Sequence, residues 1–236
     1  METLAPPPLR TDQSTWGQNV LPLIGIGTFS FVFQLGDKRV LKRPKTYPEE
    51  GNPNTAHMNA TSIEALTNEA NTTEHSIKLS FANQGNLMNY MKTKPPPTEK
   101  ARAEWIQSLA DAFAYVHSCR VIVDDIHTQN ILIHNNSPKL SDFNMSFLLP
   151  LDTDMENFSA HDTNPRIEIL QIGCVFYSIA VWSEFRYDYF DDKRFPNPDE
   201  LPSTDGIIGG MIIRKCWMGE YASMELLRKD VATSLC

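Results

Sequence analysis

The stretch that most constrains how this chain can fold covers residues 121–133 and reads VIVDDIHTQNILI. Two apolar runs enclose a polar loop that contains Asp125 and Asn130, and Asp142 follows behind another short apolar run. We expect short strands to bring these three side chains to one site, where Asp125 can accept a proton from an attacking hydroxyl. Asn130 and Asp142 can hold Mg²⁺, a cation that prefers oxygen ligands. The alternative is an ordinary loop in which Asp and Asn serve turn chemistry.

These polar groups resemble the catalytic loop and the metal-binding D-F-G motif of the eukaryotic protein kinase family. The loop reads DIHTQNILI from Asp125, and residues 142–144 read DFN. The resemblance covers most of the chain, over residues 21–231. It implies that Asp125 is the catalytic base and that Asn130 and Asp142 bind Mg²⁺.

Three positions depart from the family pattern. The family's H-R-D reads VDD at residues 123–125, its Lys two residues later is His127, and the Gly of D-F-G is Asn144. Asp124 adds a negative charge beside Asp125, so we expect the pKa of the Asp125 carboxyl to be raised. His127 replaces a cation that would stabilise the transferring phosphoryl group. Asn144 suits a glycine position because Asn enters left-handed backbone conformations more readily than most residues.

Residues 21–42 alternate apolar and small side chains and predict three strands, separated by a glycine turn and by Gly36-Asp37. Gly25 and Gly27 allow backbone N–H groups to approach phosphate oxygens, because no Cβ stands in the way. An ordinary meander of strands is the alternative, since glycines are common in hairpins.

The same residues resemble the kinase pattern G-x-G-x-x-G-x-V, with Ser30 in the position of the third glycine. The resemblance implies that the chain binds ATP and that Lys42 contacts its α- and β-phosphates. The nucleotide-binding residues that it implies are Ile24, Gly25, Gly27, Val32, Lys42, Glu69 and Ala82.

A loop over residues 44–60 and a helix from Thr61 or Ser62 to about residue 71 are predicted next. Glu69 in this helix is the carboxylate that we expect to pair with Lys42. Glu64 is the alternative partner, and either glutamate could instead be a charge on the solvated face of the helix.

The segment after this predicted helix is short. Residues 77–87 resemble the family's fifth strand, its hinge and the start of the next helix, yet only 12 residues separate Glu69 from Phe81. Ending a helix, forming a fourth strand and returning along a fifth needs at least about 20 residues. We therefore expect the small lobe to lack its fourth strand, either through loss of the strand or because the sequence is a truncated or spliced product.

The rest of the chain is predicted to be mainly helical, with an irregular polar segment over residues 145–166. The predicted helices cover residues 86–91, 98–118, 166–182, 208–217 and 221–234. Trp105, Leu109 and Phe113 recur at helical spacing and predict a core-facing stripe, and Trp217 is predicted to be buried.

Glu168 stands where the kinase family has an Asp that anchors the backbone of the catalytic loop. Its longer side chain raises the question of whether that anchor is kept. No A-P-E sequence is present, so regulation by phosphorylation of residues 145–166 is not expected.

The composition sets limits on partners and location. The chain has 21 Lys and Arg against 29 Asp and Glu, a net charge of −8, so we expect no nucleic-acid partner and no basic membrane patch. Its first residues, METLAPPP, do not resemble a signal peptide, and no apolar run reaches the ~20 residues that span a bilayer. The four cysteines form no C-x-x-C pair and are expected to be reduced thiols of a cytoplasmic or nuclear protein.

Together these features predict an α+β, two-lobed, kinase-like fold. A tail over residues 1–19 would precede a small β-rich lobe over 20–82 and a larger, mainly helical lobe over 83–236. The leading hypothesis is an ATP- and Mg²⁺-dependent kinase that phosphorylates Ser or Thr hydroxyls of an unidentified protein. A pseudokinase that binds a nucleotide or acts as a scaffold is the second. A small-molecule kinase is the third, because residues 125–130 also resemble the D-L-H-x-x-N loop of aminoglycoside and choline phosphotransferases.

Overall fold

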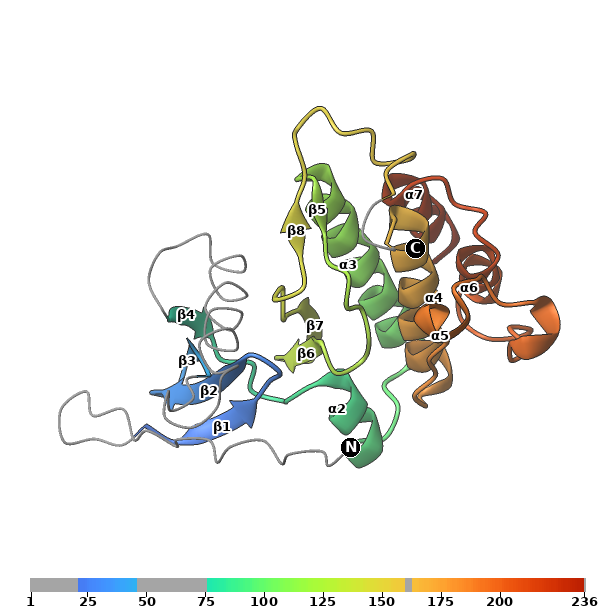
Figure 1. Cartoon of the computed structure of the whole chain (residues 1–236). Coiled ribbons are helices and arrows are strands. Elements are labelled where there is room, and N and C mark those ends of the chain that lie inside the picture. The colour runs from blue at the N-terminus through green and yellow to red at the C-terminus, as the bar shows by residue number, and fades with distance from the viewer. Residues whose placement is uncertain (1–20, 46–75, 160–162, 236) are drawn as a thin grey trace, which may run out of the picture. The chain divides into compact units, whose positions relative to one another are not determined.

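The computed structural model describes residues 21–45, 76–159 and 163–235. The chain divides between Ala82 and Asn83 into two compact units, which are described separately below. The first contains a sheet and the second contains long helices and two two-stranded sheets (Figure 1). The α+β class predicted from the sequence is therefore confirmed.

The first unit is built on an antiparallel sheet. Its strands are β1 (Leu23–Ile26), β2 (Ser30–Leu35), β3 (Arg39–Pro44) and β4 (Ile77–Ser80), and they lie in that order across the sheet. The three strands predicted over residues 21–42 are present, and β4 pairs directly with β3. Residues 46–75 lie outside the described part of the chain. The helix predicted there and the loss of a further strand both stay predictions.

The second unit contains helices α2 (Leu87–Thr93), α3 (Glu99–Ser118), α4 (Pro165–Val181), α5 (Tyr189–Asp192), α6 (Gly210–Trp217) and α7 (Met224–Leu235), with a short 3-10 turn η1 (Pro198–Glu200). A polar residue precedes each of α2, α3 and α4, and its side chain accepts a hydrogen bond from a backbone amide of the first turn. These residues are Asn86, Thr98 and Asn164. The two long helices predicted from apolar periodicity are confirmed to within about one residue.

Helices α3 and α4 run side by side through the core of the second unit, and α6 and α7 pack against them (Figure 1). The predicted α3 stripe of Trp105, Leu109 and Phe113 is buried, as is Trp217 of α6. Gly173 lets α4 and α6 approach closely, since a Cβ at this position would lie 2.6 Å from Cβ of Cys216. The close packing of α4 against α6 therefore requires a residue without a side chain at position 173.

The last two helices begin later than predicted. Helix α6 starts at Gly210 rather than at residue 208, because Gly209 before it has a left-handed backbone with φ of 65°. Helix α7 starts at Met224 rather than at residue 221. Tyr221 lies before the helix, and its hydroxyl donates a hydrogen bond to Asp230 inside it.

Two short strand pairs flank the polar loop that contains Asp125 and Asn130. Strands β6 (Ile131–His134) and β7 (Ser137–Leu140) form a hairpin whose turn residues, Asn135 and Asn136, both have positive φ. This geometry matches the right-handed twist of the strands. Strand β5 (Val121–Ile122) pairs with β8 (Phe147–Leu148), so the segment predicted to be irregular from residue 145 contains a strand.

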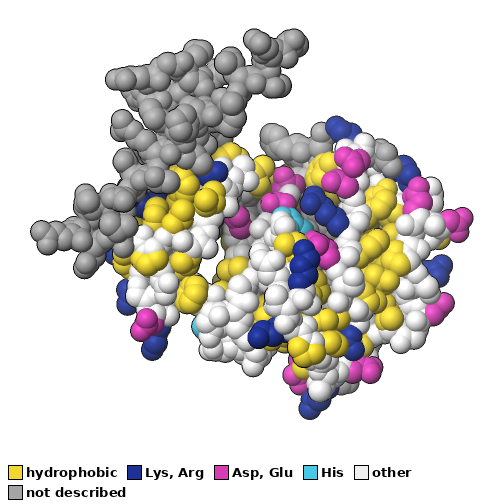
Figure 2. Space-filling model, turned by 90° about the horizontal axis from the view of Figure 1, so that it is seen from below, with side chains coloured by type: hydrophobic (Ala, Val, Ile, Leu, Met, Phe, Trp, Pro, Cys, Tyr) yellow, Lys and Arg dark blue, Asp and Glu magenta, His cyan; other side chains and the backbone are white. Residues whose placement is uncertain are grey.

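Basic and acidic side chains are interspersed on the face of the molecule shown in Figure 2, where the described residues form no large patch of a single charge. In the described part of the chain, no helix combines the length and the apolar character that crossing a bilayer requires.

Candidate functional site

The loop between β5 and β6 is held by its apolar residues. Ile122, Val123, Ile126 and Ile131 are buried, and they alternate with polar residues that stay closer to the surface. The polar side chains of Asp125, His127 and Asn130 therefore remain on a loop whose backbone is fixed by the core.

Asp125 and Asn130 are brought together as the sequence predicts. The Nδ2 group of Asn130 donates to both the backbone carbonyl and Oδ2 of Asp125, each at 3.0 Å. These two bonds fix the orientation of the Asn130 amide. Its nitrogen faces Asp125, which leaves its oxygen directed away from that carboxylate.

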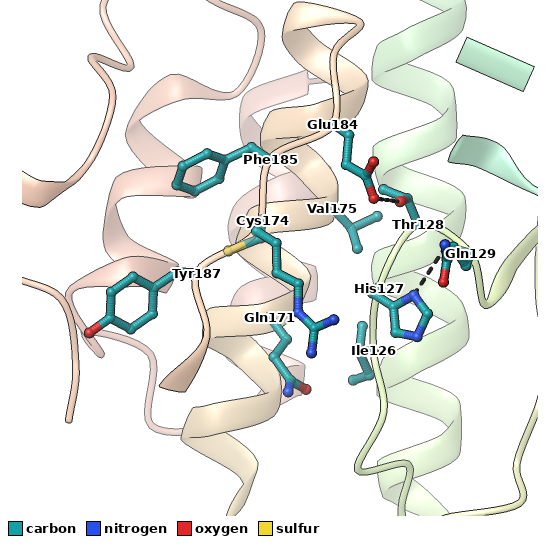
Figure 3. A pocket seen from close by; sticks show the side chains of 11 residues that line it. Ile126, His127, Thr128, Gln129, Gln171, Cys174, Val175, Glu184, Phe185 and Tyr187 are labelled. Carbon is teal, nitrogen blue, oxygen red and sulfur yellow. Dashed lines mark hydrogen bonds between the residues drawn. The ribbon is translucent and has the colours of Figure 1, made fainter. Parts of the chain in front are cut away.

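His127 is a direct partner of Asp125, a contact that the sequence did not reveal. Its Nε2 lies 3.2 Å from Oδ1 of Asp125. Its Nδ1 accepts a hydrogen bond from the backbone N–H of Gln129 at 3.2 Å (Figure 3). A neutral imidazole carries its proton on one nitrogen only. Because Nδ1 accepts, the proton resides on Nε2, which donates to Asp125.

These contacts set the protonation of Asp125. The hydrogen bond from His127 is the largest of the effects that lower the pKa of its carboxyl, and the hydrogen bond from Asn130 and the charge of Arg186 act in the same direction. Partial burial opposes them but is outweighed. The expectation that Asp124 raises this pKa is therefore wrong, and the carboxylate is ionised at neutral pH.

Glu168 of α4 anchors the start of the loop. It is fully buried, and its Oε1 accepts hydrogen bonds from the backbone N–H groups of Val123 at 2.6 Å and Asp124 at 3.0 Å. Its Oε2 lies 2.6 Å from Nε2 of His117 on α3. The longer side chain thus keeps the anchor, and it ties the loop to both central helices.

The second predicted metal ligand lies at the same end of the β6–β7 hairpin as Asn130. Ile131 pairs with Leu140, and both the N–H and the hydroxyl of Ser141 donate to the carbonyl of Asn130, at 3.0 and 2.8 Å. Asp142 follows directly. The backbone thus places a carboxylate residue and an amide residue at the same end of the hairpin, and both supply the oxygen ligands that a hard divalent cation prefers.

Two aspartates in this region have left-handed backbones. Asp124 has φ of 61° and Asp142 has φ of 60°. Residues in such conformations cluster at functional sites. Asn144, in the place of the family's glycine, is not among the residues with positive φ, and it is buried. The expectation that Asn144 adopts a left-handed backbone, as the family's glycine can, is therefore wrong.

The residues predicted to bind a nucleotide lie in the first unit. Gly25 pairs with Val32, Val32 pairs with Lys42, and Lys42 pairs with Ile77. Directly paired residues of an antiparallel sheet share a face, so Gly25, Val32 and Lys42 form one row across the same side. Lys42 is largely buried, at 6% exposure.

The other predicted nucleotide residues surround this row. Ile24 is exposed at an irregularity of the β1–β2 pairing, and Ala82 is half-buried after β4. The N–H of Gly27 donates to the carbonyl of Ser30 and closes the glycine turn. Glu69 and its alternative Glu64 lie outside the described residues, so the pairing of either with Lys42 stays a prediction.

A small cavity of about 90 Å³ lies between the catalytic-loop residues and the segment that follows α4 (Figure 3). Residues 126–129 line it on one side and residues 184–187 on the other, and Gln171, Cys174 and Val175 of α4 complete the lining. The hydroxyl of Thr128 donates to Oε1 of Glu184 at 3.0 Å and joins the two walls. Sequence reasoning missed this second wall, because residues 184–187 belong to no motif and are brought to the loop only by the tertiary fold.

Comparison with known families gives one match that covers most of the chain. The description "Protein kinase domain" applies to residues 19–183. Curated relatives include the mitosis inducer protein kinase cdr1 of Schizosaccharomyces pombe, 28% identical over 118 residues that cover 44% of this chain and 20% of that protein. NUAK family SNF1-like kinase 1 of Homo sapiens is 23% identical over 187 residues, 68% of this chain and 28% of the relative.

An Aurora kinase of Candida glabrata is 36% identical over 121 residues, which cover 46% of this chain and 32% of the relative. The matched stretches thus span less than a third of each of these relatives.

Proposed function

The chain belongs to the protein kinase family, and on this premise we propose that it transfers the γ-phosphate of ATP to Ser or Thr hydroxyls of a protein substrate, with Mg²⁺ as the metal ion. Family membership implies ATP as substrate together with a divalent cation. All three relatives are named as kinases, and cdr1 is named as a protein kinase. The matching family is also described as a protein kinase domain, which favours a protein over a small molecule as the acceptor.

The observation that carries the proposal is the ionised carboxylate of Asp125. It is held by Asn130 and His127, it remains 42% exposed on its side chain, and its pKa is lowered. A carboxylate in this state is ready to orient a substrate hydroxyl and to accept its proton. Burial without these partners would favour the protonated acid, which cannot serve as a base.

The proposed reaction assigns each residue a role. The substrate hydroxyl gives its proton to Asp125, its oxygen forms a bond to the γ-phosphorus, the bond from phosphorus to the β–γ bridging oxygen breaks, and ADP leaves. Lys42 would hold the α- and β-phosphates, and Asn130 and Asp142 would hold Mg²⁺. The ion, when bound, neutralises charge on the phosphate oxygens.

A pseudokinase is the second candidate, and His127 favours it. The residue at this position engages Asp125 and the Gln129 amide through both ring nitrogens, so it offers no free cation to a phosphoryl group. A small-molecule kinase is the third candidate, because its resemblance also rests on His127. The protein partner and a cytoplasmic or nuclear location stay expectations.

The first experiment measures nucleotide binding. Thermal-shift titration with ATP and Mg²⁺ is expected to raise the melting temperature, and Lys42→Met is expected to remove most of that rise. An exposed lysine of the same sheet provides the control variant Lys78→Met, which should behave as the parent does. The absence of any shift at millimolar ATP contradicts the nucleotide-binding part of the proposal.

The second experiment measures transfer to a Ser/Thr peptide library. Asp125→Asn keeps the shape of the side chain and removes the base, so transfer should fall by about a hundredfold or more. Asp199→Asn changes an exposed carboxylate of η1 and is the control. If ATP binds to the parent chain but no peptide is phosphorylated, the pseudokinase candidate takes precedence. Transfer by Asp125→Asn at the parent's rate excludes Asp125 as the base.

A further inference from the structure

The catalytic loop lacks a free cation of its own. His127 occupies the position at which the family pattern has Lys, yet its Nε2 donates to Asp125 and its Nδ1 accepts from Gln129. An imidazole with both nitrogens engaged cannot also bind an oxygen of a phosphoryl group. A protein cation that replaces the family's loop lysine at the transferring phosphoryl group must therefore come from another part of the fold.

Arg186 is a cationic side chain near the catalytic loop. It lines the same small cavity as His127, on the wall formed by the segment after α4. Its side chain is 57% exposed, and its ion pair with Asp188 is long at 3.6 Å.

The segment that carries Arg186 is held from both sides. On one side Thr128, which is almost fully buried, donates to Glu184 at 3.0 Å. On the other side the N–H of Phe185 donates to the hydroxyl of Ser178 at 3.0 Å, and the Phe185 ring packs against Tyr177 and Trp217 with centroids 5.2 and 5.3 Å apart. The backbone that carries Arg186 is therefore held in place, which electrostatic catalysis by its side chain would require.

We propose that Arg186 is the cation that contacts the transferring phosphoryl group in the transition state, in place of the lysine that the catalytic loop lacks. The inference rests on the proposed transfer from ATP to a hydroxyl. It adds no covalent step: Arg186 binds oxygens of the γ-phosphoryl group while the bond from the acceptor oxygen forms and the bond to ADP breaks. The planar fork of Arg suits two oxygens of one phosphoryl group.

The test compares four variants. Arg186→Ala removes the cation, Arg186→Lys keeps the charge without the fork, and Arg186→Ala with His127→Lys returns a cation to the loop position. Arg214→Ala, on the exposed face of α6, is the matched control. We expect kcat to fall about a hundredfold in Arg186→Ala, with KM for ATP nearly unchanged. The double variant should regain at least a tenth of the parent kcat, and a structural role for Arg186 would not produce this rescue.

A binding measurement tests the same residue without turnover. ADP with Mg²⁺ and aluminium fluoride mimics the transferring phosphoryl group, and the parent should bind this mixture about tenfold or more tightly than ADP with Mg²⁺ alone. Arg186→Ala should lose most of that difference, while its affinity for ADP alone stays at the parent value. The double variant should regain the difference.

The outcomes separate this inference from the function on which it rests. A parent chain that binds no nucleotide or transfers no phosphate contradicts the proposed function itself. The role of Arg186 alone is overturned if the parent transfers phosphate and Arg186→Ala is equally active, with the same gain in ADP affinity from aluminium fluoride. Loss of activity without rescue by His127→Lys, together with unchanged aluminium fluoride binding, also overturns it.

Discussion

The buried carboxylate of Glu168 offers a direct test of how the catalytic loop is held. The substitution Glu168→Leu keeps a side chain of similar size and removes both oxygens. It leaves the backbone N–H groups of Val123 and Asp124 and the ring of His117 without the acceptor that each has now. Glu168 and His117 are both buried, so water does not readily replace the lost oxygens.

The size of the effect follows from these three contacts. A buried polar group that loses its partner costs about 1–3 kcal/mol. Three such groups, offset in part by the gain from burying an apolar side chain, give an expected loss of roughly 3–5 kcal/mol in the free energy of unfolding. Because a whole domain is stable by only about 5–15 kcal/mol, the variant should lose much of its resistance to urea.

Urea unfolding followed by tryptophan fluorescence suits this measurement. Trp105, Trp182 and Trp217, three of the four tryptophans, lie in the second unit together with Glu168. Glu104→Leu, at an exposed position of α3, is the control and should change the free energy of unfolding by less than about 0.5 kcal/mol. A Glu168→Leu variant within about 1 kcal/mol of the parent would refute the reasoning, since the three contacts would then contribute little.

Three further outcomes are expected. Gly173→Ala places a Cβ against Cys216, so chemical denaturation should show a loss of about 1–3 kcal/mol; an unchanged midpoint would contradict the close approach of α4 and α6. The folded-state pKa of Asp125 is lowered, so its stabilisation is present above its unfolded pKa and is lost as pH falls through the folded value. Unfolding at several pH values should therefore show Asp125→Asn less stable than the parent at neutral pH, with the difference vanishing in acid. Hydrogen exchange should be slower in α3 and α4 than across residues 21–45, and equal protection would contradict the prediction of a weaker small lobe.

The parts of the site that the sequence reveals depend on short-range geometry. The apolar spacing of Trp105, Leu109 and Phe113 predicts α3, since helical periodicity alone places them on one face. The positions of Asn130 and Asp142 follow from a hairpin that joins neighbouring residues. In such cases the local pattern determines which side chains meet.

The parts that the sequence does not reveal depend on long-range packing. The contact between Thr128 and Glu184 joins residues that are 56 positions apart, and no spacing rule connects them. Arg186 belongs to the same segment and carries no motif. The contact between His127 and Asp125 was not predicted either. The kinase pattern has a phosphate-binding lysine at the position of His127, whereas the fold directs Nε2 of His127 to Asp125.

The β6–β7 hairpin also bears on the order in which the site forms during folding. Ser141 bonds to Asn130 across only 11 residues, whereas Glu168 reaches Val123 across 45. Closing a short loop costs less chain entropy and takes less time than closing a long one. The predicted metal-binding end of the hairpin should therefore assemble early, while the support of Asp125 waits for α4 to dock. A nascent chain would thus present its metal-binding oxygens before its base is in place.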